Sequence, residues 1–185
     1  MKKNILLNVT GSISAFKSCS LISMLVKNGY DVKVIPTEDA LHFVGKASFA
    51  GLSHNKIEFS MFENDNPISH IYLAQTWADL IISYPASANT INRLALGLAD
   101  DLFGACCLAN NFKKPLLIAP AMNTQMFLHP SVQASLEKLK LWKAVILPCG
   151  KGKLACGIEG EGRLLEPEDA FKIIEDVLKR DKNFD

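Results

Sequence analysis

The sequence has few features of a membrane protein or of a nucleic-acid-binding protein. Its 185 residues contain no apolar run of about 18 residues, which is the length that a membrane-spanning helix needs. Lys and Arg total 20 and Asp and Glu total 19, so the net charge of +1 gives no electrostatic basis for binding nucleic acid. The length suits one compact domain, and we expect residues 1–185 to form it.

Cysteine is present, but its pattern argues against a disulfide framework and against a metal site. The five cysteines are odd in number and form no CxxC pair. They are Cys19, Cys106, Cys107, Cys149 and Cys156. We expect reduced thiols in a cytoplasmic protein with no bound metal. The amino terminus does not indicate a signal peptide, because its apolar run Ile5–Val9 is short and no small-residue cleavage site follows.

Strand and helix patterns alternate along the chain. The predicted strands are Ile5–Val9, Asp31–Ile35, Ala78–Ser83, Leu116–Ala119 and Ala144–Leu147. The predicted helices are Ala15–Lys27, a helix starting after Pro36 with Thr37 as its N-cap, Thr90–Ala99, Leu102–Asn110, Val132–Leu139 and Pro167–Lys179. This alternation predicts a three-layer α/β/α fold of the Rossmann-like or flavodoxin-like kind, with a central parallel sheet. Residues 47–66 have the least regular pattern, and residues 149–166 are Gly-rich and indicate a surface loop.

The turn after the first strand has the composition of an anion site. It reads Gly11-Ser12-Ile13-Ser14, where the glycine allows a tight turn and the Ser hydroxyls and the following helix N-terminus offer hydrogen-bond donors. The alternative is a simple βα turn with a Ser cap. The turn matches neither GxGxxG nor a P-loop, so a mononucleotide such as FMN suits it better than a dinucleotide.

Two further strand ends carry polar groups beside small residues. The segment Pro85-Ala86-Ser87-Ala88-Asn89-Thr90 would let a flat ring approach the backbone, although its hydroxyls also suit a helix N-cap. The segment from Pro120 to Phe127 follows a buried strand and places the amide of Asn123 where ligands of open α/β sheets bind. We expect at least one of Met122 and Met126 to be an ordinary core contact.

A histidine and a cysteine complete the set of candidate groups. His70 could handle protons near neutral pH, although a lone histidine is more often structural. Cys156 lies in a segment with three glycines in six positions, which would suit a pliable lid with an exposed thiol. The alternative for Cys156 is a small buried hydrophobic residue.

Together these segments resemble the flavin-dependent cysteine decarboxylases, a family that includes phosphopantothenoylcysteine decarboxylases and lantibiotic peptide decarboxylases. PASANT is identical to the family motif, and residues 11–17 are similar to its GSIAAYK. Residues 120–127 are similar to PxMNxxMW, with Phe127 in place of Trp, and the segment around His70 is similar to HIxLxxWAD. Residues 155–163 match ACGxxGxGR, the substrate clamp of the bacterial phosphopantothenoylcysteine decarboxylases.

The resemblance implies FMN as the cofactor and a role for each matched residue. The catalytic residues would be His70 and Cys156, with Cys156 as the proton donor. The flavin would contact Gly11, Ser12, Ile13, Thr37, Phe43, Ser87, Ala88, Asn89, Thr90 and Ala121. The substrate would contact Asn123, Met126, Lys153, Leu154 and Ala155. The flavin would serve as an electron sink for a decarboxylation that otherwise leaves an unstabilised carbanion.

The ACGxxGxGR segment favours 4'-phosphopantothenoylcysteine as the substrate, because the peptide decarboxylases usually lack it. The alternatives are a peptidyl-cysteine decarboxylase and a non-catalytic regulatory flavoprotein. Such regulators often carry charged tails, whereas only Asp181–Asp185 follow the last predicted helix here. The resemblance also implies a homotrimer or dodecamer with FMN at the subunit interface. With 185 residues, we expect the phosphopantothenoylcysteine synthetase of the pathway to be a separate protein.

Overall fold

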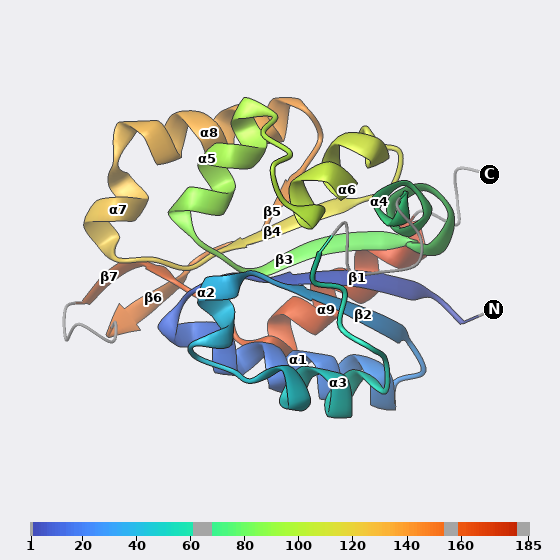
Figure 1. The fold of residues 1–185 in the computed structure, drawn as a ribbon. Coiled ribbons are helices and arrows are strands. Elements are labelled where there is room, and N and C mark those ends of the chain that lie inside the picture. The colour runs from blue at the N-terminus through green and yellow to red at the C-terminus, as the bar shows by residue number, and fades with distance from the viewer. Residues whose placement is uncertain (1, 61–67, 154–158, 181–185) are drawn as a thin grey trace.

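The computed structural model describes residues 2–60, 68–153 and 159–180. Its centre is a parallel sheet with the strand order β2-β1-β3-β4-β5 (Figure 1). The strands are β1 (Asn4–Val9), β2 (Asp31–Pro36), β3 (Leu80–Ala86), β4 (Leu116–Pro120) and β5 (Val145–Ile146). Leu7 on β1 pairs with Val34 on β2 and with Ile82 on β3. The predicted three-layer α/β/α fold with a parallel sheet is confirmed.

Helices cover both faces of the sheet (Figure 1). One layer holds α1 (Phe16–Lys27), α3 (Lys46–Ser53) and α9 (Pro167–Arg180). The other holds α5 (Ala88–Leu96), α6 (Leu102–Asn110), α7 (Thr124–Leu128) and α8 (Pro130–Leu141). Short elements connect the rest: η1 (Ile13–Ala15), α2 (Glu38–Leu41), α4 (Ser69–Ile71) and the π-helix η2 (Tyr72–Trp77). Among the described residues, no helix is long and apolar enough to cross a membrane.

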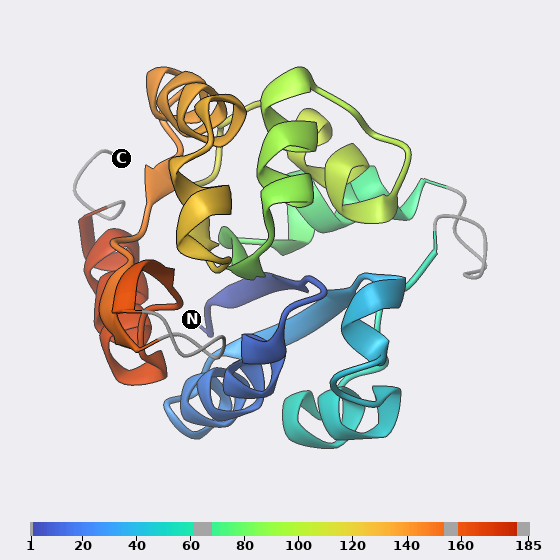
Figure 2. The same ribbon diagram turned by 90° about the vertical axis from the view of Figure 1, so that its left-hand side faces the viewer.

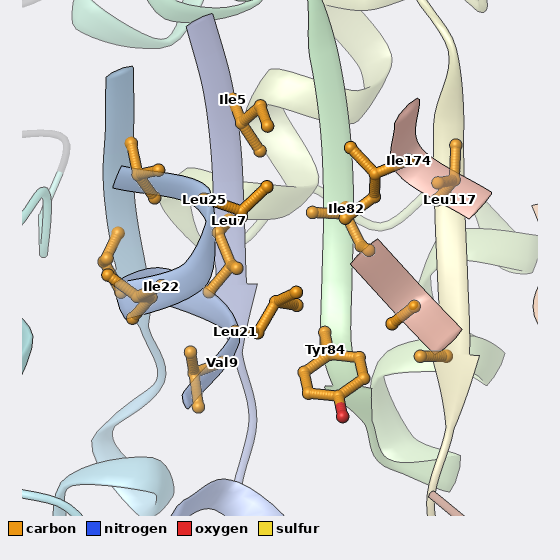
Figure 3. Close-up of a cluster of buried hydrophobic side chains, with 14 of the residues drawn as sticks. Ile5, Leu7, Val9, Leu21, Ile22, Leu25, Ile82, Tyr84, Leu117 and Ile174 are labelled. Carbon is orange, nitrogen blue, oxygen red and sulfur yellow. The ribbon is translucent and has the colours of Figure 1, made fainter. Parts of the chain in front are cut away.

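The two helical layers explain why the strands are apolar throughout. Adjacent residues of a strand point to opposite faces, so Leu7 packs under α1 and α9 while Leu6 packs under the other layer. Figure 3 shows the first of these cores, where Leu21 of α1 and Ile174 of α9 face the strands. Burying one such Leu or Ile side chain contributes about 1.5–3 kcal/mol relative to leaving it exposed. The whole of β3 is buried, as a central strand of such a sheet requires.

Some element boundaries differ from the sequence prediction. β3 was expected to end at Ser83 but continues to Ala86, and its pairing with β4 shifts register between these two residues. The shift lets the chain carry Pro85, which has no N–H to donate, without ending the strand. α5 begins two residues earlier than predicted because Ser87 caps it, and it ends at Gly97, which has φ +70°.

Two segments that were expected to be irregular contain regular structure. Residues 46–53 form α3, whose Phe49 is fully buried against the first core. The predicted surface loop contains a hairpin of β6 (Gly150–Lys153) and β7 (Glu159–Arg163), which pair antiparallel. Neither segment has a strong apolar periodicity, because Gly51 interrupts the first and glycines fill the second.

Candidate functional site

Two cavities lie at the carboxyl ends of the central strands, the edge that faces the viewer in Figure 2. Their volumes are about 530 Å³ and about 370 Å³, and we call them cavity 1 and cavity 2. Gly11 and Ser87 line both cavities. These residues follow β1 and β3, between which the strand order reverses, and ligands of open α/β sheets bind at such switch points.

The turn after β1 lies where both cavities meet. Ser12 caps η1, because its Oγ accepts a hydrogen bond from the Ser14 backbone N–H at 3.2 Å. Gly11 has no room for a side chain, since an added Cβ would lie 2.5 Å from the Cβ of Asp39. Ile13 is 61% exposed and lines cavity 2, where it presents an apolar surface. The predicted flavin residues Gly11, Ser12 and Ile13 therefore lie together at one site.

Cavity 1 is bordered by the starts of two helices. Ser87 caps α5 and Thr37 caps α2, with each hydroxyl accepting a backbone N–H of its helix. The Oγ atoms of Ser87 and Thr90 lie 3.2 Å apart, and Asn89 also lines this cavity. Helix N-termini carry partial positive charge and unsatisfied N–H groups, so this border is suited to an anion.

The charged side chains around cavity 1 are mostly acidic. Arg93 pairs with Asp100 and with Asp101, in the latter case at 3.1 Å, and Asp101 also accepts the Gly104 backbone N–H at 2.7 Å to cap α6. Glu38 and Asp39 line the same cavity. An anion bound here would therefore depend on hydroxyls and backbone N–H groups. Sequence reasoning missed this cluster, because only the fold brings residue 93 next to residues 100 and 101.

Cavity 2 contains the segment after β4. Ala121 is buried, and its N–H donates to the Ala86 carbonyl at 3.0 Å. Asn123 caps α7, where its Oδ1 accepts the Gln125 N–H at 2.8 Å, and its side chain also lines cavity 2. Met126 is half-exposed at the cavity, whereas Met122 packs against the second core, as expected for at least one of the two.

Two positively charged side chains, Lys17 and Arg163, line cavity 2, and both form ion pairs with Glu166. The Lys17 Nζ lies 2.8 Å from Glu166 Oε1, and Arg163 lies 2.7 Å from the same oxygen. The hydrogen bond from Lys17 lowers the pKa of Glu166, and Arg163 adds to this effect. Lys17 and Arg163 are the charged residues among those that line this cavity, so it attracts anions. The sequence patterns included both cations, but without a role for either.

The hairpin strand β7 packs directly on the segment that holds Asn123. The Met122 N–H donates to the Gly162 carbonyl at 3.0 Å, and Thr124 Oγ1 donates to the Glu161 carbonyl at 2.9 Å. Gly162 has φ +104°, and a Cβ there would lie 2.5 Å from the Met122 oxygen. A Cβ on Gly160 would lie 2.3 Å from Thr124 Oγ1. Gly160 and Gly162 of ACGxxGxGR thus permit close packing against residues 122–124.

Part of the predicted substrate site lies outside the described residues. This applies to Leu154, Ala155 and Cys156, and also to the side chain of Lys153 at the end of β6. Their proposed roles stay predictions. Phe43 is described and is about half-exposed, but it lines neither cavity.

His70 also lies outside both cavities. It belongs to α4, and its Nδ1 is buried without a hydrogen-bond partner among the described residues, as is the Oγ of Ser69. The stretch that follows holds one more residue between Leu73 and Trp77 than the HIxLxxWAD pattern has. The π-helix η2 accommodates this residue, with the Ala78 N–H donating to the Leu73 carbonyl at 2.9 Å.

Comparisons with known proteins agree with the geometry. The sequence profile of a family described as Flavoprotein matches residues 1–179. The coenzyme A biosynthesis bifunctional protein CoaBC of Bacillus subtilis is 45% identical over 175 residues, which cover 94% of this chain and 42% of that protein. The probable phosphopantothenoylcysteine decarboxylase of Streptococcus mutans is 38% identical over 180 residues, which cover 96% of this chain and 100% of that protein. The chain thus spans less than half the length of the bifunctional relatives that it matches.

Two solved structures are similar over nearly their whole length. One is a PPC decarboxylase variant in complex with pantothenoylaminoethenethiol, with a TM-score of 0.83, 31% identity, and coverage of 95% of this chain and 97% of that chain. The other is the FMN-binding protein AtHal3, with a TM-score of 0.80, 31% identity, and coverage of 95% and 96%. The chain therefore belongs to the flavoprotein family, and the resemblance to its cysteine decarboxylases that the motifs predicted is confirmed.

Proposed function

We propose that this protein uses FMN to decarboxylate 4'-phosphopantothenoylcysteine to 4'-phosphopantetheine in coenzyme A biosynthesis. One observation carries the proposal: Asn123 shares cavity 2 with the flavin turn Gly11–Ile13 and with two cations. The names of the relatives from B. subtilis and S. mutans support the pathway, and the structural likeness to a PPC decarboxylase supports the reaction. A phosphopantothenoylcysteine synthetase activity would supply the substrate.

The residues around the two cavities fit FMN. The hydroxyls of Thr37 and Ser87, with the helix starts beside them, would hold the phosphate at cavity 1. The small residues Ala88 and Ala121 would flank the ring at cavity 2, which Gly11 also lines. Bound FMN would supply reversible two-electron redox chemistry at the cysteine-type end of the substrate, which serves as the electron sink for loss of CO₂.

The protein residues would hold the substrate and move protons. The amide N–H groups of Asn123 would donate to the substrate carboxylate until it leaves. Lys17 and Arg163 would raise the local concentration of this anionic substrate at cavity 2. Cys156 would supply the proton that completes the product, and His70 would assist proton transfer or orient the substrate.

A second copy of the chain would complete the site, in a homotrimer or a dodecamer. Among the described residues, Ile13 and Met126 present exposed apolar side chains at cavity 2. His70 and Phe43 line neither cavity of their own chain, so each would reach the flavin of a neighbouring copy.

The cofactor and the substrate can be tested separately. Purified protein is expected to be yellow, with flavin absorbance bands, or to become so on reconstitution with FMN. A colourless protein that does not take up FMN contradicts the proposal. Turnover is then assayed with 4'-phosphopantothenoylcysteine and with a peptide that ends in cysteine, and only the first is expected to lose CO₂. Cys156→Ser should release an oxidised enethiol, whereas full turnover by this variant would exclude the cysteine as the proton donor.

Mixing two inactive variants tests whether one site uses two chains. His70→Asn and Asn123→Asp are each expected to be inactive. When they are unfolded and refolded together, about a quarter of the sites in a random cyclic trimer would combine an intact His70 with an intact Asn123 from a neighbour. Recovery of about that share of activity supports the shared site. No recovery, with trimers formed and loaded with FMN, means that both residues act from one chain.

A further inference from the structure

The side chain of one buried residue, Thr10, ties the turn after β1 to the turn after β3. Thr10 is 1% exposed. Its hydroxyl donates to the Pro85 carbonyl at 2.8 Å and accepts the Ser87 backbone N–H at 2.9 Å. Its own backbone N–H donates to the same Pro85 carbonyl at 3.3 Å. Three hydrogen bonds therefore set the distance between the two turns, and the hydroxyl makes two of them.

Both turns border the two cavities. Residues 11–13 follow Thr10 directly, and Ser87 is the N-cap of α5, where its Oγ accepts the Thr90 N–H at 3.3 Å. A shift of Ser87 would therefore move the first turn of α5. The turn after β2 joins the same point, because the Thr37 N–H donates to the Val9 carbonyl at 2.9 Å. The three turns that carry the polar residues of the site meet at Val9–Gly11.

We propose that Thr10 is a positioning residue for the flavin, which fixes the spacing of these two turns before FMN binds. The inference rests on the placement of FMN proposed above. Without the hydroxyl, the half-buried Ser87 N–H loses its acceptor, and the turn is no longer held in one position. A binding site that has to be reordered as the ligand arrives binds more weakly than one already in place.

The experiment compares Thr10→Val, Thr10→Ser and Ser83→Ala. Valine has nearly the shape of threonine but no hydroxyl, whereas serine keeps the hydroxyl. Ser83 is the matched control, because its Oγ donates to Asn8 Oδ1 at 2.7 Å and so also joins β3 to β1 through a fully buried hydroxyl. Ser83 lines neither cavity. Each protein is prepared free of flavin and titrated with FMN, and its unfolding temperature is measured without flavin.

We expect Thr10→Val to raise the Kd for FMN about tenfold, which is the effect of losing one well-placed hydrogen bond. Thr10→Ser should restore most of the affinity. Ser83→Ala should lower the unfolding temperature by a similar amount to Thr10→Val and leave the Kd unchanged. A Thr10→Val protein that binds FMN as tightly as wild type overturns the inference. A wild-type protein that does not bind FMN contradicts the proposed function instead.

A second measurement needs no variant, in case Thr10→Val does not fold. Hydrogen exchange of the Ser87 amide is followed in the wild-type protein without flavin. Strong protection is expected, because the Thr10 hydroxyl already accepts this N–H in the absence of a ligand. Rapid exchange that becomes slow only on addition of FMN would mean that the flavin orders the turn, and the positioning role of Thr10 would be excluded.

Discussion

Replacing Gly162 with alanine tests whether β7 must pack on the Asn123 segment. Gly162 has φ +104°, where an L side chain is strained, and an added Cβ would lie 2.5 Å from the Met122 oxygen and 3.3 Å from the Phe127 Cβ. The Met122 oxygen belongs to the backbone and cannot rotate away. The substituted strand must therefore either carry the strain or lift off the segment.

Both responses have a similar cost. Holding alanine in this backbone conformation costs about 1–3 kcal/mol. Lifting β7 away loses the bonds from Met122 to Gly162 and from Thr124 to Glu161, at about 0.5–1.5 kcal/mol each. For a chain of this length, 1 kcal/mol lowers the unfolding temperature by about 2–4 °C, so we expect a decrease of roughly 2–12 °C. The segment that holds Asn123 would also lose its hydrogen bonds to β7, so the KM for substrate should rise.

Gly150→Ala is the control within the same hairpin. A Cβ at Gly150 meets only side-chain atoms of Arg163 at 3.7 Å, which is ordinary contact, and its φ is not positive. Thermal unfolding and steady-state kinetics are measured for both variants. If Gly150→Ala is as harmful as Gly162→Ala, or if Gly162→Ala unfolds and turns over like wild type, then the close packing of β7 on Met122 does not support the site.

Three other predictions follow from described contacts. Tyr84→Phe removes the hydrogen bond from the Tyr84 hydroxyl to the Leu165 carbonyl at 2.6 Å, so it should lower stability by about 1 kcal/mol in denaturant unfolding, and an unchanged midpoint would contradict this. The pKa of Glu166 is lowered from 4.5, so its ion pairs stabilise the fold above that pH and are lost as the pH falls through the lowered pKa. The difference in unfolding free energy between wild type and Glu166→Gln should therefore disappear in acid. A difference that stays constant with pH would argue against these ion pairs. Burial raises the pKa of Cys106 to about 12 and that of Cys107 well above 9.0. Neither thiol should therefore react with iodoacetamide at pH 8 in the folded protein, and peptide mass spectrometry would measure this. Labelling of either cysteine would mean that α6 opens.

The three layers and the succession of strands and helices along the chain followed from local patterns. Each apolar strand and each amphipathic helix has its own signal, and the parallel sheet then follows from their alternation. What the sequence could not indicate was contact between distant segments. The ion pair of Lys17 with Glu166 joins residues 149 positions apart, which no spacing rule relates. β7 escaped prediction because its stabilising contacts lie on Met122 and Thr124 and not within its own sequence.

The sequence motifs indicated some of the residues that line the two cavities. Residues in short strand-end turns, such as Gly11, Ser87 and Asn123, could be assigned because a turn fixes its own geometry. Thr10 escaped notice because a threonine directly after a strand is ordinary, and its proposed role depends on a partner 77 positions away. His70 was assigned by motif alone, and its place in the fold does not follow from that motif.

The π-helix of residues 72–77 accommodates an extra residue without changing the structure that follows it. It takes up one residue beyond the HIxLxxWAD pattern within a single wide turn. Directly afterwards the Asp79 N–H donates to the Asn4 carbonyl at 2.8 Å, and Ile5 pairs with Leu80 as β1 and β3 come into register. The insertion is therefore absorbed before the sheet begins. Changes in length at this turn are separated from the strand ends that border the two cavities, so the surface around His70 can vary while Gly11 and Ser87 stay in place.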